Sequence, residues 1–184
     1  MLKVSFDPFP VLRTERLRLR RVVSSDAECI YRLRSDANTM RYIARPLAQS
    51  IDDAREHVRL IDEKVSENTG INWAIAFPHE TDLIGIIGLF RIEPENYRAE
   101  LGYMLLPEYH NRGIISEAIK KVIEYGFSQM NLHSIEAIID PENGASAKVL
   151  EKNGFVREAH LRENKFFNGK FLDTVIYSKL ATDR

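Results

Sequence analysis

The sequence predicts a mixed α/β fold in which helices flank a mostly antiparallel, twisted sheet. Two observations carry this prediction. Three strand-like runs, residues 72–77, 83–92 and 99–105, follow one another with turn-rich segments between them, as in an antiparallel meander. After them the hydrophobic period lengthens, and the order becomes helix, strand, helix and strand. A meander followed by such an alternation describes a mixed sheet covered by helices.

The N-terminal third of the chain predicts one strand and two helices. In Arg16–Arg21, leucines alternate with arginines, which is the period-two pattern of a strand with one buried face. We therefore expect these arginines on a solvated face rather than in a nucleic-acid site. Ser25 and Glu28 have the spacing of a capping box ahead of a first helix, and Ser50 has the position of an N-cap ahead of a second.

The C-terminal half predicts two helices, a buried strand and a hairpin. Apolar residues recur at helical spacing in the range Ile119–Met130, so we expect a long helix with one face on the sheet. A buried strand is expected at residues 135–139, and a short helix at residues 143–153. Gly154 is expected to end that helix in the left-handed conformation. Asn168-Gly169 predicts a two-residue turn between the last two strands.

The composition limits the classes of function. With 184 residues, 44% of them hydrophobic and 29% charged, the chain has the makeup of one soluble globular domain spanning residues 1–184. A net charge of -1 gives no basic excess that would bind a nucleic-acid backbone or an anionic membrane. The sequence contains neither a charged-then-apolar leader nor a run of about 18 apolar residues. We therefore expect a cytoplasmic protein.

Cysteine and histidine usage predicts neither a disulfide nor a metal site. Cys29 is the only cysteine, which rules out an intrachain disulfide, and it lies among apolar residues of the first expected helix. The five histidines are scattered without the close pairing that zinc ligands usually show. We expect no metal and assign Cys29 no catalytic role.

The segment Leu105–Ala118 predicts an anion site built from main chain. A strand runs into Asn111, Arg112 and Gly113 and then into a helix, whose first-turn N-H groups lack partners and lie at the positive end of the helix dipole. Gly113 allows a close approach to a ligand, and Arg112 adds a positive charge. On this segment alone, a plain strand-to-helix turn explains the residues equally well. The chain contains neither GxxxxGK[ST] nor a GxGxxG that opens a helix.

Two ordered blocks resemble the GNAT superfamily of N-acetyltransferases. Residues 109–118 resemble its acyl-CoA loop, Q/R-x-x-G-x-G/A, with Gly113 matching and with His110 and Ile115 replacing the other two defining residues. Residues 143–155 resemble its Asn-x-x-Ser segment, with a helix and a closing Gly-Phe. The resemblance covers nearly the whole chain. It is strongest to the branch that includes ribosomal-protein N-terminal (alanine) acetyltransferases, in which dimers are common.

The resemblance implies a GNAT-type fold and acetyl-CoA as co-substrate, with direct transfer of the acetyl group to a primary amine. The acceptor would be a protein N-terminus or a small amine, and the residues leave open an acyl group larger than acetyl. The residues that would bind the co-substrate are Met104, Leu105, Leu106, His110, Asn111, Arg112, Gly113, Ile114, Ile115, Ser116 and Asn143. Asn143 has a second interpretation as the cap of the helix that it precedes.

The same resemblance implies where the catalytic groups lie. A main-chain N-H near Met104 and Leu105 would hold the thioester carbonyl. Many members of the family place a tyrosine where this chain has Leu150, so Ser146 is the remaining candidate acid for the thiolate, unless it only caps a helix.

The candidate bases are Glu100, on the strand that enters the loop, and Glu158, just after Gly154-Phe155; each would act directly or through water. Both also fit as solvated strand charges. Because Leu150 and Ile115 depart from the family pattern, an acyl-CoA-binding regulatory protein without turnover is the alternative function.

Overall fold

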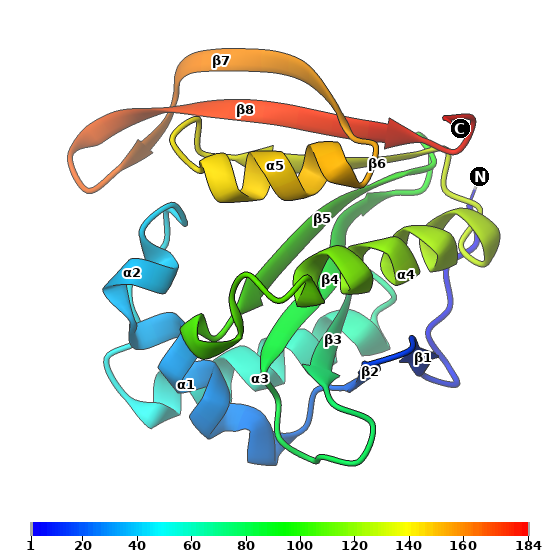
Figure 1. Cartoon of the computed structure of the whole chain (residues 1–184), viewed down its shortest axis with the longest axis vertical. Coiled ribbons are helices and arrows are strands. Elements are labelled where there is room, and N and C mark those ends of the chain that lie inside the picture. The colour runs from blue at the N-terminus through cyan, green and yellow to red at the C-terminus, as the bar shows by residue number, and fades with distance from the viewer. Residues whose placement is uncertain (1, 184) are drawn as a thin grey trace.

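The computed structural model describes residues 2–183 and has the mixed α/β architecture expected from the sequence (Figure 1). Helices flank a mostly antiparallel sheet, which confirms the predicted fold class. Two single turns of 3-10 helix, at Ser24–Asp26 and Pro107–Tyr109, accompany the regular elements. In chain order the strands and helices are β1 (Leu12–Arg13), β2 (Arg18–Arg21), α1 (Ala27–Ser35), α2 (Ala37–Met40), α3 (Ile51–Ser66), β3 (Ile71–Ala76), β4 (Gly85–Glu93), β5 (Arg98–Leu105), α4 (Ile114–Ser128), β6 (Ser134–Ile139), α5 (Gly144–Lys152), β7 (Val156–Phe167) and β8 (Lys170–Leu180).

The eight strands form one sheet in the order β1-β2-β3-β4-β5-β6-β8-β7. Strands β1 to β5 are joined in sequence by antiparallel pairings, as the predicted meander requires. β5 and β6 are parallel, and α4 makes the crossover between them, because a parallel pair cannot be joined by a short turn. α5 then leads into the β7–β8 hairpin, which adds to the sheet through β8.

Helices cover both faces of the sheet. α4 and α5 pack on one face over a core that includes Trp73, which is fully buried and meets Tyr125 of α4 edge to face at 5.5 Å. α1 and α3 pack on the other face over a second apolar cluster, which includes Ile30 and Leu33 of α1. Figure 1 shows α4 and α5 in front of the sheet. Within residues 2–183, no helix combines the length and the apolar character needed to cross a bilayer.

The N-terminal predictions are partly wrong. β2 buries Leu17 and Leu19 as expected, but Arg20 is not solvated, because Asp26 pairs with its guanidinium at 2.7 Å and both side chains are largely buried. The predicted Ser25–Glu28 capping box does not form. A turn of 3-10 helix comes before α1, and Asp26 instead accepts a hydrogen bond from the N-H of Val23 at 2.9 Å.

The predicted helix and hairpin ends are confirmed. The side chain of Ser50 accepts a hydrogen bond from the N-H of Asp53 at the start of α3. Gly154 follows α5 with a φ of 80°, and Asn168 and Gly169 turn the last hairpin with φ of 47° and 77°. The sequence did not predict α2, a single four-residue helix capped by Asp36.

Candidate active site

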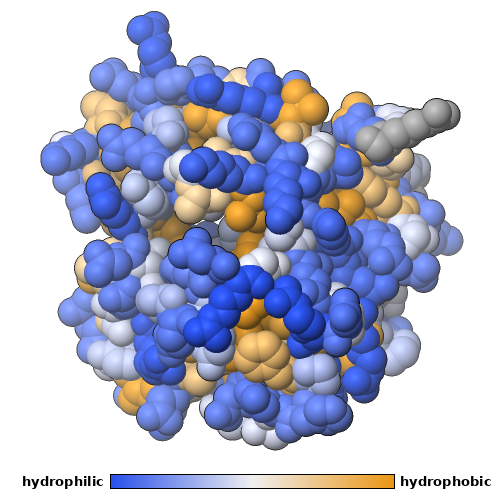
Figure 2. Space-filling model, viewed as in Figure 1, coloured by the Kyte–Doolittle hydropathy of each residue, from blue (hydrophilic) through white to orange (hydrophobic). Residues whose placement is uncertain are grey.

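The sheet splits between β5 and β6. These strands pair only at residues 98–100 with 134–136 and then separate, although β5 continues to Leu105 and β6 to Ile139 (Figure 1). The main-chain groups that face the split beyond these pairs therefore have no strand partner. Figure 2 shows that polar side chains cover most of the α4–α5 face, while apolar atoms come to the surface near its centre, between the two helices. We call this opening the strand split.

The hydrogen bonding of β5 corrects which main-chain groups face the strand split. Leu106 donates its N-H to the carbonyl of Ile84 at 2.9 Å, and its side chain is 2% exposed. Because residues of a strand alternate in direction, Met104 also directs its main chain toward β4, whereas Tyr103 and Leu105 direct theirs into the split. Of the expected residues Met104, Leu105 and Leu106, only Leu105 offers main-chain groups there.

The loop after β5 ends in an open helix N-terminus. Asn111 and Gly113 have φ of 60° and 74°, and Gly113 is the N-cap of α4 without any side-chain cap. The first-turn N-H groups therefore point out of the helix without a main-chain partner. His110 fastens the loop to β5, because its Nε2 lies 3.0 Å from the carbonyl oxygen of Leu105. We call residues 110–116 the loop–helix junction.

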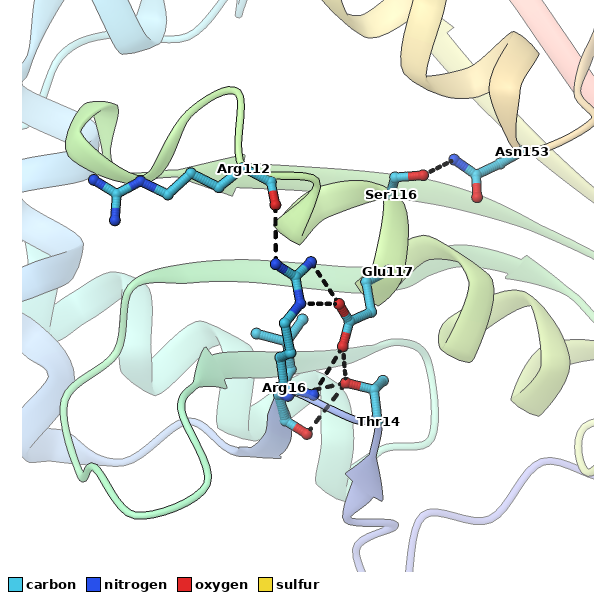
Figure 3. Close-up of polar contacts among 7 residues, drawn as sticks. Thr14, Arg16, Arg112, Ser116, Glu117 and Asn153 are labelled. Carbon is cyan, nitrogen blue, oxygen red and sulfur yellow. Dashed lines mark hydrogen bonds and ion pairs between the residues drawn. The ribbon is translucent and has the colours of Figure 1, made fainter.

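Arg16, which lies just before β2, braces the loop–helix junction through hydrogen bonds (Figure 3). Its Nε donates to Oε2 of Glu117 at 2.7 Å, and its Nη1 donates to the carbonyl oxygen of Arg112 at 3.1 Å. Thr14 and the N-H of Arg16 donate to the other carboxylate oxygen. Burial raises the pKa of Glu117, but these hydrogen bonds outweigh it and hold the pKa below its usual value. The brace was not visible in the sequence, because it joins residues about 100 positions apart.

The side chains of the first turn of α4 serve the core rather than a ligand. Ile114 is 2% exposed, Ile115 packs against the core, and the Ser116 hydroxyl accepts a hydrogen bond from the buried amide of Asn153 at 3.0 Å (Figure 3). These three residues can therefore meet a ligand mainly through their main chain. The exposed guanidinium of Arg112 lies over the ring of Tyr109 at 5.5 Å.

A cavity of about 330 Å³ opens beside the loop–helix junction. Arg16, Lys120 and Lys152 bring three cations to its lining and Glu15 and Glu117 bring two carboxylates, together with the main chain at Gly113. Sequence reasoning missed both lysines, which lie on α4 and at the end of α5. The junction thus combines unpartnered N-H groups with nearby positive charge, which suits an anion such as a phosphate.

Asn143 caps α5, and this leaves Ser146 beside a buried phenol. The Asn143 side chain accepts a hydrogen bond from the N-H of Ser146 at 3.1 Å, so the capping interpretation of Asn143 is observed. The hydroxyl oxygen of Tyr103 is buried and has no hydrogen-bond partner among residues 2–183. Burial raises the pKa of the Tyr103 phenol, and nearby Ser146 lowers it by a smaller amount. Tyr103 is the acid candidate that sequence reasoning missed.

Glu100 and Glu158 lie on one sheet face but far apart. Glu100 pairs with Glu136 of β6, Glu136 with Ser178 of β8, and the Ser178 hydroxyl donates to Glu158 of β7 at 2.6 Å. Adjacent strands are about 4.8 Å apart, so roughly 14 Å separates the two ends of this row. One amine cannot contact both carboxylates.

The two glutamates also differ in environment. Glu100 is 7% exposed and lies at the last β5–β6 pair, whereas Glu158 is exposed on the edge strand. Burial raises the pKa of Glu100, although Arg91, whose Nη1 lies 2.6 Å from Oε2, lowers it in part. A carboxylate with a raised pKa at the mouth of the strand split is a stronger base than an ordinary glutamate and is placed to accept a proton.

A second and larger cavity, of about 510 Å³, lies between residues 37–47 and the β7–β8 hairpin. The end of β6, residues 138–140, lies beneath it, and this part of β6 borders the strand split. Figure 1 shows α2 opposite the turn of the hairpin. We call this space the hairpin cavity. The hairpin cavity therefore borders the split, whereas the 330 Å³ cavity lies beside the first turns of α4, at the end of the loop that continues β5.

Comparison with known proteins fits this geometry. Residues 16–156 match the family model described as an acetyltransferase (GNAT) domain. An uncharacterized N-acetyltransferase of Bacillus subtilis, YoaA, is 38% identical over 170 residues, which cover 92% of this chain and 96% of that protein. The chain belongs to the GNAT acetyltransferase family. The family and the acyltransferase class expected from the sequence are thereby confirmed.

Two solved structures show which ligands and acceptors occur among the relatives of this acetyltransferase. Spermidine N-acetyltransferase of Vibrio cholerae, in complex with CoA and spermine, is 27% identical with a TM-score of 0.81, covering 92% of this chain and 98% of that one. Ribosomal-protein-S5-alanine acetyltransferase of Vibrio fischeri is 26% identical with a TM-score of 0.80, covering 95% and 98%. One relative is thus named for a polyamine and the other for a ribosomal protein.

Proposed function

We propose that this protein is an acetyl-CoA-dependent N-acetyltransferase that passes the acetyl group directly to a primary amine in a ternary complex. The observation that carries the proposal is the strand split, which is bordered by the hairpin cavity at the end of β6 and is followed along β5 by the loop–helix junction. A thioester and an amine can meet there without a covalent enzyme intermediate.

The residues at the loop–helix junction fit CoA. The open N-terminus of α4 offers main-chain N-H groups to a pyrophosphate, and Arg16, Lys120 and Lys152 add charge for its phosphates. The edge of β5 offers the main-chain groups of Tyr103 and the N-H of Leu105 to the amides of the pantetheine arm, as a neighbouring strand would, while the carbonyl of Leu105 is held by His110. The apolar surface between α4 and α5 suits the alkyl parts of that arm.

The reaction needs a base, an oxyanion donor and an acid. The amine nitrogen attacks the thioester carbonyl carbon, the C-S bond breaks, and the amine loses a proton while the thiolate gains one. Glu100, buried at the split, is our candidate base, acting directly or through water. A main-chain N-H of β5 at Leu105 is our candidate donor to the oxyanion.

For protonation of the thiolate we assign Tyr103 together with Ser146. The Tyr103 hydroxyl is buried without a partner, borders the split and lies near Ser146, whose own position is set by the Asn143 cap. Because a thiol has a pKa of about 8.5, the leaving group needs only modest assistance from such a pair. The pair would take the place of the tyrosine that the family pattern expects at Leu150.

Thiol release from acetyl-CoA in the presence of peptide N-termini, lysine peptides, polyamines and small amines tests the proposal, with CoA binding measured by calorimetry. We expect turnover with at least one amine class. Tight CoA binding without turnover on any amine would favour the regulatory alternative, and the absence of CoA binding would overturn both.

The roles of Tyr103 and Ser146 are tested by kinetics of single variants. Tyr103→Phe and Ser146→Ala should each lower kcat about tenfold or more while the Kd for CoA stays within about twofold. Tyr177→Phe is the matched control, because it removes a buried phenol hydroxyl that donates to Glu151 on α5 at 3.1 Å. Equal losses of kcat in Tyr103→Phe and Tyr177→Phe would show that Tyr103 acts only in packing.

A further inference from the structure

The hairpin cavity is lined by more cations than carboxylates. Arg41 and Arg45 follow α2, and Lys165 and Lys170 flank the turn of the hairpin, so four cations line this space. No carboxylate within residues 2–183 forms an ion pair with any of them. Arg41 stacks on the ring of Tyr42 at 5.1 Å, which fixes its position without neutralising it.

The two carboxylates of the lining are already occupied by hydrogen bonds. Asp140 accepts from the N-H of Glu142 at 2.8 Å, which closes the turn after β6. Asp173 accepts from the N-H of Glu163 at 2.8 Å and lies 2.7 Å from Nε2 of His160. The N-H of Glu163 and the contact with His160 hold the pKa of Asp173 below its usual value. Four free cations thus face two carboxylates that serve local structure.

The positive charge lies apart from the negative charge that an attacking amine would need. Glu100 and Glu136 form the last β5–β6 pair and lie outside the lining of the hairpin cavity, while the arginines and lysines belong to the loop and hairpin around it. Lys165 nevertheless acts on Glu100, because its charge opposes the rise in the pKa of that carboxyl. Arg45 also acts on His57 of α3. Burial lowers the pKa of His57 to about 4, and the charges of Arg34 and Arg45 add to this effect.

We propose that the hairpin cavity selects amine acceptors that carry negative charge next to the amine, and that it discriminates against polyamines. Such an acceptor places its amine toward Glu100 and its carboxylates among Arg41, Arg45, Lys165 and Lys170. A polyamine instead brings a second ammonium group into a ring of four cations, where like charges repel. The inference rests on the proposed function, since it names the acceptor class of that same site.

The test compares kcat/KM for acceptors that differ only in charge. The panel is one peptide with N-terminal alanine followed by acidic, neutral or basic residues, with free glutamate, glycinamide and spermidine as the small acceptors. We expect the acidic peptide to exceed the neutral one at least tenfold at low salt, the basic peptide and spermidine to be poorest, and the preference to shrink in high salt. If free glutamate is also preferred over glycinamide, the natural acceptor is a small acid. If only the acidic peptide is preferred over its neutral counterpart, the natural acceptor is a protein N-terminus.

Variants show whether these cations cause the preference. In the double variant Arg45→Gln, Lys165→Gln, the ratio of acidic to neutral kcat/KM should fall about tenfold. Lys121→Gln is the matched control, since it removes one cation from α4, outside the hairpin cavity, and should leave the ratio unchanged. A ratio near one in the unaltered protein, or a preference for spermidine, would overturn the inference while leaving the acetyltransferase activity intact.

A measurement of product binding tests the inference even if no acceptor is turned over. Fluorescence anisotropy of N-acetylated acidic and neutral peptides, which are the reaction products, measures the charge preference of the cavity in the presence of CoA. We expect the acidic product to bind at least tenfold more tightly. Equal binding would overturn the inference. If no amine is acetylated, the proposed function fails, and this measurement alone decides whether the cavity prefers anions.

Discussion

The loop–helix junction and the hairpin cavity are built in different ways. The junction is one contiguous segment that presents main-chain N-H groups, held by the positive φ of Gly113 and by the brace from Arg16. The hairpin cavity is lined by side chains from α2 and its loop, from β6 and from the last hairpin, which come together only in the folded protein. In the function that we propose, main chain at the junction would bind the co-substrate, whereas side chains around the hairpin cavity would bind the acceptor.

This difference explains how a family can share one co-substrate and differ in acceptor. A side-chain substitution leaves most main-chain donors in place, so the junction tolerates sequence change. The hairpin cavity changes its charge whenever one lining residue changes. Four predictions test this contrast, from the largest expected effect to the smallest.

Glu100→Gln should have the largest effect, because Glu100 is the proposed base and lies at the last β5–β6 pair, where the strand split begins. We expect kcat/KM to fall about 100-fold or more with CoA affinity unchanged. A base acts when deprotonated, and burial raises the pKa of Glu100, so activity should fall as pH drops through a value above the usual range of glutamate. The variant should lose this acidic limb of the pH–rate profile.

Glu158→Gln is the control for that experiment. It removes an exposed carboxylate on the same sheet face and should keep both the rate and the acidic limb. All variants are assayed with one peptide acceptor, so that titration of the amine is common to them. An acidic limb that survives in Glu100→Gln and disappears in Glu158→Gln would reverse the assignment.

His57 should make stability depend on pH. Burial, with Arg34 and Arg45, lowers its pKa from 6.5 to about 4, so between these values the unfolded chain binds more protons than the folded one. The stabilisation is therefore complete above pH 6.5 and is lost as pH falls toward 4, by on the order of 2 kcal/mol. Urea unfolding between pH 4 and 7 measures it.

His57→Gln should flatten that dependence, and Arg45→Gln should raise the pKa of His57 in an NMR titration. A pKa of His57 that is unmoved by Arg45→Gln would show that burial alone lowers it. That result would remove one argument for a positive electrostatic potential on this side of the hairpin cavity.

Gly113→Ala should weaken CoA binding about tenfold. A Cβ would meet only Nη2 of Arg16, at 3.5 Å, so the cost comes from the φ of 74°, roughly 1–2 kcal/mol for a residue other than glycine. Gly169→Ala is the matched control, with a φ of 77° and open space around it. Both variants should lose similar stability, but only Gly113→Ala should change the Kd measured by calorimetry.

Arg16→Ala should weaken CoA binding several-fold, which is the smallest effect. It removes both the ion pair to Glu117 and the hydrogen bond to the carbonyl of Arg112, so the loop loses its brace as well as a charge. Arg21→Ala removes a comparably exposed arginine that pairs with Asp62 on α3 and should leave the Kd unchanged. Equal losses from both would mean that general charge, rather than the brace, matters.

Local features of the sequence predicted local structure well. Ser50, Gly154 and Asn168-Gly169 each stabilise a turn or helix end through their own side chain or backbone freedom, so position along the chain was sufficient. The period of the apolar residues likewise placed the strands and long helices within a few residues of their observed bounds. The Ser25–Glu28 capping box did not form, because the neighbouring Asp26 accepts hydrogen bonds from the N-H of Val23 and from the guanidinium of Arg20 instead.

The candidate site was only partly predictable. The segment from His110 to Ser116 was recognised, because it lies in one stretch. Tyr103 was missed, since Ser146, which lies near its hydroxyl, is 43 residues away in the sequence and since its proposed role depends on the split of the sheet. Met104 and Leu106 were assigned to the split although strand alternation turns their main chain toward β4.

The sequence by itself determined the order of the main strands and long helices, the family and the position of the loop that we propose binds an anion, because these depend on periodicity and on short contiguous motifs. Only the tertiary structure decided which carboxylate reaches the strand split, which phenol lies beside Ser146 and which cations surround the hairpin cavity. The physical reason is that burial, pKa and charge complementarity are set by neighbours in space, and the neighbours of Glu100 and Lys165 come from distant parts of the chain.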